Sequence, residues 1–220
     1  MNLNQARENM IEQQIRPWDV LDQRVLNVLA EIPRERFVAD SCRDIAYSDY
    51  QLPIGHGQTL LNPNVDGRLL QALAITTTDS VLEIGTGSGF LTACLSRLAG
   101  KVHSIEIIPE LHQQAVGRLQ QLGCGNTRCA VQDAAEEWDA ADAYNAIAIT
   151  GSLPSIPPFY QQKIALNGRL FVVIGGPDQP TMEALLLTRV SGTEWVTESL
   201  FETRIPPLQN FDTQKKTFQF

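Results

Sequence analysis

The sequence lacks the cysteine and histidine patterns that bind metal ions. Its 220 residues contain four cysteines and three histidines, with no CxxC pair and no histidine cluster. This spacing excludes the usual zinc-ligand sets, and a chain of this length does not need disulfides to hold its core. We therefore expect no metal site and four reduced, mostly buried thiols. The cysteines are Cys42, Cys94, Cys124 and Cys129.

The chain is also short of positive charge and of long hydrophobic runs. Seventeen lysines and arginines stand against 25 acidic residues, a formal net charge of −8, whereas a general nucleic-acid-binding surface needs a basic face. No stretch approaches the roughly 18 uninterrupted apolar residues of a membrane span. The polar start MNLNQARENM has no apolar signal-peptide region. We expect a soluble, cytoplasmic protein that binds neither nucleic acid nor membrane.

What the sequence does contain is the composition and length of one globular domain. Hydrophobic residues make up 43% and charged residues 19% of the chain, which is outside the range of disordered proteins. The length fits a single domain. The patterns divide it into a helical cap with a long loop (1–75), a core of alternating strands and helices (76–180), and a C-terminal sheet-edge segment with a tail (181–220).

The first third combines helical spacing with an irregular loop. Apolar residues recur at helical intervals in 10–15 and 20–29, and again in 65–73. Proline ends each of the first two segments. Residues 44–63, in contrast, are rich in Tyr, Gly and Pro and have no period. An ordered loop of this length inside a compact domain is usually functional.

From Asp79 onward, strand patterns alternate with helix patterns. This alternation is typical of a parallel, doubly wound sheet. The fold class we predict is α/β, a Rossmann-like, mostly parallel sheet with an N-terminal helical cap. From Thr181 a short helix mixes with strand-like stretches such as 194–201, which we expect as antiparallel additions at the sheet edge. The predicted core strands are 80–84, 101–107, 127–131, 143–150 and 169–174, and the predicted helices are 91–98, 110–122 and 160–166.

The sharpest local signal is a strand that runs into glycines and then into a helix, Val81-Leu-Glu-Ile-Gly-Thr-Gly-Ser-Gly89. Glycine lets the backbone turn tightly and approach a ligand closely, and the helix that follows offers unpaired amides. A dinucleotide site would place a further glycine at position 90, which is Phe90, and a P-loop would end in Gly-Lys-Ser/Thr. An NAD-dependent oxidoreductase is therefore a distant alternative.

Two acidic residues at successive strand ends extend this site. Glu106 ends the second strand, about 20 residues after Gly85, where an acidic side chain accepts hydrogen bonds from ribose hydroxyls. Asp133 follows the third strand, in position for an adenine amino group. Each alone would be an exposed strand-end acid. Together with the glycine loop they predict a nucleoside pocket built from three successive strand ends.

The glycine loop resembles the S-adenosylmethionine loop of class I methyltransferases, and residues 6–208 resemble the protein-L-isoaspartate O-methyltransferase family. The resemblance implies S-adenosylmethionine as cofactor. It also implies a protein or peptide substrate whose abnormal isoaspartyl carboxylate is methylated, so that it can return to aspartate through a succinimide. The likeness is carried by the loop and by RVLNVLAEIPRERFV (24–38), AYSDYQLPIGHGQTLLNP (46–63), HSIEI (103–107), LNGRLFVVIG (166–175) and ETRIPPL (202–208).

The same resemblance assigns the cofactor-binding residues. Glu106 would take the ribose and Asp133 the adenine. Trp138 is most simply a packing residue, in a position from which it could flank the adenine. The methionine moiety would lie among Glu83, Gly85, Thr86, Gly87, Ser88 and Gly89.

The acceptor loop departs from the family pattern, which reads Gly-Gln-Thr, an aliphatic residue, a serine beside the substrate carboxylate, any residue and a proline. Here Leu61 stands at the serine position. A carboxylate is already ionised at pH 7 and needs no general base, so the lost hydroxyl costs about 1.5–3 kcal/mol without abolishing the chemistry. The catalytic residues we predict are Thr59, as a substitute hydroxyl, and Gln58.

Two other functions stay open beside isoaspartyl methylation. The chain either methylates a different acceptor or binds the cofactor without turnover, because the acceptor half is altered while the cofactor half is kept. The family's Gly-Asp-Gly after the third strand is likewise reduced to Gln132-Asp133-Ala134. We expect residues 209–220 to form a disordered tail.

Overall fold

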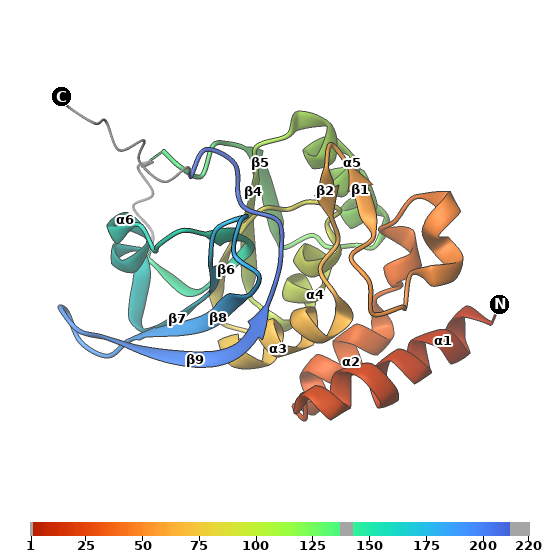
Figure 1. Cartoon of the computed structure of the whole chain (residues 1–220), viewed down its shortest axis with the longest axis horizontal. Coiled ribbons are helices and arrows are strands. Elements are labelled where there is room, and N and C mark those ends of the chain that lie inside the picture. The colour runs from red at the N-terminus through yellow and green to blue at the C-terminus, as the bar shows by residue number, and fades with distance from the viewer. Residues whose placement is uncertain (1, 137–142, 212–220) are drawn as a thin grey trace.

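A seven-stranded sheet forms the centre of the structure, a computed structural model that describes residues 2–136 and 143–211 (Figure 1). The strand order is β5-β4-β3-β6-β7-β8-β9. The first five strands in this order are parallel, and β8 and β9 are antiparallel additions at one edge. This arrangement confirms the predicted fold class. The strands are β3 (Ser80–Ile84), β4 (Lys101–Glu106), β5 (Thr127–Val131), β6 (Tyr144–Leu153), β7 (Ile164–Ile174), β8 (Met182–Arg189) and β9 (Trp195–Thr203).

Helices cover both faces of this sheet. The helices α3, α4 and α5 contribute to the core on one face and α6 to the core on the other. An N-terminal cap of α1, α2 and short π- and 3₁₀-helical turns packs outside α3 and α4 (Figure 1). Within the described residues, no helix is both long and apolar enough to cross a membrane. The helices are α1 (Leu3–Met10), α2 (Gln23–Glu31), α3 (Pro63–Leu73), α4 (Phe90–Leu98), α5 (Pro109–Gln121) and α6 (Pro158–Gln162).

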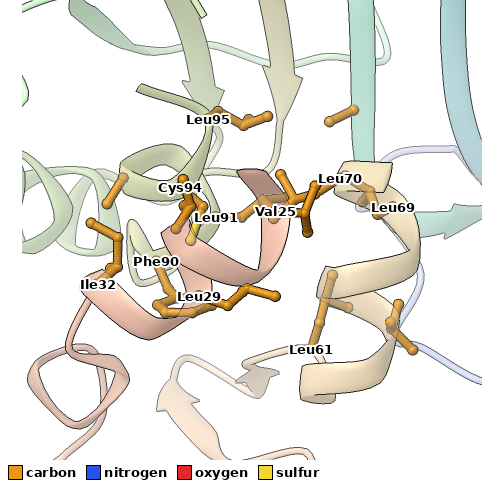
Figure 2. Close-up of a cluster of buried hydrophobic side chains, with 14 of the residues drawn as sticks. Val25, Leu29, Ile32, Leu61, Leu69, Leu70, Phe90, Leu91, Cys94 and Leu95 are labelled. Carbon is orange, nitrogen blue, oxygen red and sulfur yellow. The ribbon is translucent and has the colours of Figure 1, made fainter. Parts of the chain in front are cut away.

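The larger core joins the cap to the sheet through α3 and α4. Figure 2 shows Val25 and Leu29 of α2 packed between Leu70 of α3 and Phe90 at the start of α4. These side chains are almost fully buried, and a buried leucine or phenylalanine stabilises the fold by about 1.5–3 kcal/mol. The cap is therefore part of the domain core, and it holds the start of α3 in place.

The chain after β9 returns across the carboxyl ends of the central strands (Figure 1). Ser152 at the end of β6 donates its amide to the carbonyl of Pro206 (2.9 Å), and its carbonyl accepts from the amide of Leu208 (3.0 Å). These bonds fasten the C-terminal segment, residues 204–211, against β6. Residues 212–220, most of the predicted tail, lie outside the described part of the chain.

Two predicted helices were wrong in part. Of the helix expected at 160–166, only residues 160–162 are helical, as the end of α6 (Pro158–Gln162), because Ile164 already pairs with Tyr144 in the sheet. The short helix expected after Thr181 is instead the strand β8. The leucines of β8 do not alternate with polar residues, because this strand lies between β7 and β9 and packs on both faces. The loop 44–63 contains a two-stranded hairpin, β1 (Pro53–Gly55) and β2 (Gln58–Thr59).

Candidate active site

A pocket opens at the carboxyl ends of the parallel strands, where β3 lies between β4 and β6. The chain builds the sheet outward from β3 in both directions, and this reversal is where open α/β sheets bind ligands. The pocket walls come from the glycine loop after β3 and from the ends of β4, β5 and β6. The loop before α3 and the C-terminal segment complete them.

The glycine loop needs its glycines for both conformation and space. Gly85 and Gly89 each have a φ of 90°, in the region that residues with a side chain rarely adopt. A Cβ on Gly85 would collide with the Thr150 hydroxyl, which donates to the Gly85 carbonyl (2.8 Å). A Cβ on Gly89 would lie 3.2 Å from that of Ala115 in α5. The loop is thus pressed against β6 and α5, with its remaining side open to the pocket.

The residues predicted around the methionine moiety lie in two layers. The first layer lines the pocket, and the second, Glu83 and Gly89, is not part of the lining. The Glu83 side chain lies on the face of β3 that is turned towards α4. There the Thr92 hydroxyl donates a hydrogen bond to its Oε2. The lining residues of this set are Gly85, Thr86, Gly87 and Ser88.

Glu83 is a fully buried carboxyl group with an unused acceptor. Its Oε2 accepts hydrogen bonds from the Thr92 and Ser104 hydroxyls, while Oε1 has no hydrogen-bond partner among the described residues. Burial raises the pKa of Glu83 to about 8, although the two hydroxyls oppose the shift. A cationic group brought close to this carboxyl would stabilise its ionised form.

Glu106 lies at the end of β4, with both carboxylate oxygens held by backbone amides. Gly87 donates to Oε2 (2.8 Å) and Ile108 donates to Oε1 (3.0 Å). The side chain therefore ties the glycine loop to the start of α5 and has one fixed orientation. A carboxylate has about four acceptor positions, so Glu106 retains capacity for two hydroxyl donors in the pocket that it lines.

Asp133 lines the same pocket after β5, the strand next to β4 in the sheet. Its Oδ1 accepts from the amide of Ala135 (2.8 Å), and its Oδ2 accepts from the side-chain amide of Asn210 (2.6 Å). Asn210 belongs to the C-terminal segment, from which Phe211 also lines the pocket. This wall therefore depends on a contact between residues 77 positions apart. Trp138, expected as a packing residue that could flank the adenine, lies outside the described residues.

The acceptor loop brings Gln58, Thr59 and Leu61 together on the pocket wall. The strand β2 ends at Thr59, and residues two apart in an extended segment share a face, which agrees with Thr59 and Leu61 both lining the pocket. The Thr59 hydroxyl is buried and has no hydrogen-bond partner among the described residues. Leu61 is 6% exposed and belongs to the core next to the pocket (Figure 2). This end of the pocket is thus apolar, with one unpaired hydroxyl.

Beneath the acceptor loop lies a buried ion pair that sequence reasoning missed. Arg34 donates to Asp66 (2.6 Å), to the carbonyl of Ala46 (3.0 Å) and to the carbonyl of Leu61, and its guanidinium lies 4.7 Å from the centre of the Phe90 ring. Both charged side chains are 1% exposed. Burial raises the pKa of Asp66 to about 6, although the guanidinium opposes the shift.

The pocket lining is negatively charged. Asp66, Glu106 and Asp133 are its ionisable residues, and no lysine, arginine or histidine of the described chain lines it. Phosphate groups would meet like charge here without a compensating cation. A cationic ligand such as a sulfonium would be attracted. The electrostatics therefore disfavour a dinucleotide and favour a sulfonium cofactor.

Several residues have roles outside the pocket. His56 is in the exposed turn between β1 and β2, and His103 pairs with the Tyr144 hydroxyl (2.9 Å). Trp18 packs edge-on against Phe201. The four cysteines are free, with two buried and two partly exposed. The described residues contain no group of three potential ligands suitable for a metal ion.

Local sequence signals for the missed residues were weak. Asp66 interrupts an otherwise apolar helix face between Val65 and Leu69, and a charge in such a stripe indicates a buried partner. Nothing local identifies Arg34 as that partner, since 32 residues separate the two. The C-terminal wall is equally remote from the strand ends that it covers.

Comparison with known proteins places the chain in a family. Residues 4–208 match the family described as protein-L-isoaspartate(D-aspartate) O-methyltransferase. Protein-L-isoaspartate O-methyltransferase 1 of Rhodopseudomonas palustris (strain HaA2) is 38% identical over 202 residues, which cover 92% of this chain and 82% of the relative. The protein-L-isoaspartate O-methyltransferase of Protochlamydia amoebophila (strain UWE25) is 40% identical over 181 residues, covering 82% of this chain and 84% of the relative.

A solved structure shows the same fold. A Plasmodium falciparum protein described as a protein-L-isoaspartate O-methyltransferase, crystallised with S-adenosyl-L-homocysteine, superposes with a TM-score of 0.80 at 19% identity. The match covers 95% of this chain and 99% of that one. The predicted resemblance is thereby confirmed. The chain belongs to the protein-L-isoaspartate(D-aspartate) O-methyltransferase family.

Proposed function

We propose that the protein transfers a methyl group from S-adenosylmethionine to the carboxylate of isoaspartyl residues in damaged proteins or peptides. The observation that carries the proposal is the pocket at the β3 strand end. It combines a glycine loop and the carboxylates of Glu106 and Asp133 with an acceptor loop of the family type, and no lysine, arginine or histidine of the described residues lines it. Family membership supports both the cofactor and the reaction class.

The cofactor end of the pocket has groups that fit each part of S-adenosylmethionine. Glu106 would accept the two ribose hydroxyls, because its orientation is fixed and half of its acceptor capacity is free. Asp133 would accept from the adenine amino group. The methionine moiety would lie along Gly85, Thr86, Gly87 and Ser88, with Gly89 and the unpaired Oε1 of Glu83 behind them.

The charge of the pocket matches the chemistry that the cofactor supplies, which is a methyl group on a cationic sulfur. The acceptor oxygen forms a bond to the methyl carbon while the carbon–sulfur bond breaks and its electron pair stays on sulfur. The carboxylates of Glu106 and Asp133 would stabilise positive charge in the pocket, because Asp66 is already paired with Arg34, and the product S-adenosylhomocysteine has lost that charge. The protein therefore binds the product less favourably by electrostatics than the cofactor.

At the acceptor end the protein orients the substrate and excludes water. An isoaspartyl carboxylate is ionised at pH 7, so no side chain has to remove a proton. Thr59 would donate its hydroxyl to this carboxylate, since that hydroxyl is buried at the pocket wall without a partner. Gln58 would donate its side-chain amide. Such positioning accounts for several kcal/mol of barrier lowering.

One observation favours a second candidate, methylation of an uncharged acceptor. Leu61 offers no hydrogen bond, and the carboxyl group of Asp66 also lines the pocket. Since Arg34 is directed at Asp66 and at two carbonyls, no cation of the described pocket lining is left for an anionic acceptor. A neutral hydroxyl or amide substrate would meet less repulsion here than a carboxylate.

The deciding experiment is methyl transfer from labelled S-adenosylmethionine to an isoaspartyl peptide, with the normal aspartyl peptide as control. We expect incorporation into the isoaspartyl peptide alone. Thr59→Val removes the hydroxyl at nearly constant shape, and we expect kcat/KM to fall about tenfold to a hundredfold with unchanged S-adenosylhomocysteine binding. No incorporation by a preparation that binds the cofactor would overturn the isoaspartyl proposal and leave the uncharged acceptor to be tested.

A further inference from the structure

Three arginines line a second cavity, which shares no lining residue with the proposed active site. Arg36 comes from the 3₁₀ turn Arg34–Arg36 and Arg43 from the 3₁₀ turn Asp40–Ile45, while Arg118 and Gln121 come from α5. The cavity, completed by Leu122, has a volume of about 180 Å³, which is room for a small ion with water. We call it the arginine cavity.

The positive charges of the arginine cavity are largely uncompensated. No carboxylate lines it among the described residues. Arg43 pairs with Asp40 (3.0 Å), which is exposed. Among the described residues, Arg118 donates to two neutral oxygens, the Ser88 carbonyl (3.0 Å) and the Gln114 side chain (3.4 Å). The Arg36 side chain makes no hydrogen bond or ion pair in the described part of the chain.

This concentration of positive charge runs against the composition of the protein. The chain has an excess of eight acidic residues, yet three arginines line one cavity whose described lining contains no carboxylate. Burial without an anionic partner lowers the pKa of Arg118, which reflects the free-energy cost of its partly desolvated charge. Guanidinium forks match the geometry of oxyanions, to which they donate two parallel hydrogen bonds.

Arg118 also connects the arginine cavity to the cofactor pocket. The carbonyl that accepts from its Nη1 belongs to Ser88 in the glycine loop, and Ser88 is buried and lines the cofactor pocket. One guanidinium therefore faces the cavity and holds the loop at the same time. An anion that fixes this guanidinium also fixes the loop, and coupling of this kind is reciprocal between the two sites.

We propose that the arginine cavity binds a small oxyanion of the phosphate class, and that its occupation strengthens cofactor binding through Arg118 and the Ser88 carbonyl. The first half of this proposal is independent of the methyl acceptor. The second half rests on the cofactor assignment made above.

Titration with inorganic phosphate at constant ionic strength, followed by NMR or calorimetry, tests the site. We expect saturable binding by the native protein and at least tenfold weaker binding by Arg36→Ala, with Arg36→Lys between them because lysine keeps the charge without the fork. Arg128→Ala is the matched control, since Arg128 is an exposed arginine of β5 outside the cavity. Absence of saturation, or an equal loss in Arg128→Ala, overturns the proposal as non-specific charge attraction.

The coupling is measured as the affinity for S-adenosylhomocysteine with and without saturating phosphate. We expect at least fivefold tighter binding with phosphate in the native protein, and no such change in Arg36→Ala. If phosphate binds but leaves the affinity unchanged, the coupling is wrong. If S-adenosylhomocysteine fails to bind at all, the cofactor assignment fails, and the phosphate titration still decides on the site.

Discussion

The two ends of the pocket are built on different principles. At the cofactor end, Glu106 and Asp133 are each held by two hydrogen bonds, so their free acceptor positions have fixed directions. At the acceptor end, the wall consists of Leu61 and the unpaired hydroxyl of Thr59. The Arg34–Asp66 pair lies below them. The cofactor end is prepared for one ligand, whereas the acceptor end, in the part of the chain that the structure describes, has an unpaired hydroxyl and no cation in its lining.

The two ends also differ in what their charged groups bind. Arg34 is the cation nearest to the acceptor loop, and it stabilises the loop itself by binding the Leu61 carbonyl. A buried pair of this kind is expensive to break, at about 3–5 kcal/mol when one partner is removed. The acceptor end is therefore rigid in its backbone while its side chains leave the substrate weakly specified.

The largest effect is expected from removing the fixed carboxylate at the cofactor end. Glu106→Ala takes away both proposed ribose contacts and releases the Gly87 and Ile108 amides. Two hydrogen bonds to a charged group contribute about 3–6 kcal/mol together, so we expect S-adenosylhomocysteine binding to weaken by two decades or more. Calorimetry measures this, with the exposed Glu136→Ala as control. A change below tenfold would mean that Glu106 serves only the loop.

The second prediction concerns the pH dependence that Glu83 imposes on stability. Its folded-state pKa is about 8 against an ordinary value of 4.5, so between these values the folded protein holds a proton that the unfolded chain has released. Stability from this group is therefore present at low pH and is lost as the pH rises, by roughly 4 kcal/mol between pH 5 and 8.

Urea unfolding at pH 5, 6.5 and 8 checks this sign and size. Glu83→Gln keeps the shape and the hydroxyl contacts but cannot ionise, so we expect its free energy of unfolding to fall less over this range. Glu110→Gln, an exposed acid in α5, should parallel the native protein. If the free energy of unfolding of Glu83→Gln changed with pH in parallel with that of the native protein, the carboxyl group would be ionised throughout and its burial would be compensated.

The third prediction sharpens the contrast at the acceptor end. Leu61→Ser restores a hydroxyl beside the proposed carboxylate position, and Leu61→Ala removes the same bulk without adding a donor. If the substrate is isoaspartate, kcat/KM of the serine variant should exceed that of the alanine variant about tenfold to a hundredfold. Equal rates in the two variants would show that position 61 does not contact the carboxylate.

The same contrast explains how much could be predicted from the sequence. The strands around the glycine loop, Glu106 and Asp133 follow from local period and spacing, and the predicted sheet was confirmed. The helix expected up to residue 166 was partly wrong. Tyr160 and Ile164 are both buried and four residues apart, which is helical spacing, but Ile164 belongs to a strand and pairs with Tyr144. The spacing of neighbouring residues carries no information about strand pairing between residues as far apart as Tyr144 and Ile164.

The parts of the pocket that escaped prediction are those made by distant segments. The Arg34–Asp66 pair and the Asp133–Asn210 contact bring together residues that no local pattern links. The site residues named from the sequence stay predictions until ligand binding is measured. Their positions explain why the cofactor end was easier to predict, since three of its parts follow consecutive strands.

The smallest effect is expected from Asn210, which closes the cofactor end. Its amide occupies one acceptor position of Asp133 Oδ2, and the carboxylate has capacity for the adenine amino group beside it. Asn210→Ala should therefore loosen the C-terminal wall and weaken S-adenosylhomocysteine binding about twofold to tenfold.

S-inosylhomocysteine, which lacks the adenine amino group, distinguishes two causes of this weakening. If Asn210 only supports the wall, both ligands weaken equally, whereas tighter binding of S-adenosylhomocysteine alone would mean that Asn210 competes with the amino group for Asp133. That result would mean that the C-terminal segment weakens cofactor binding, and that the cofactor end is not fully prepared for its ligand.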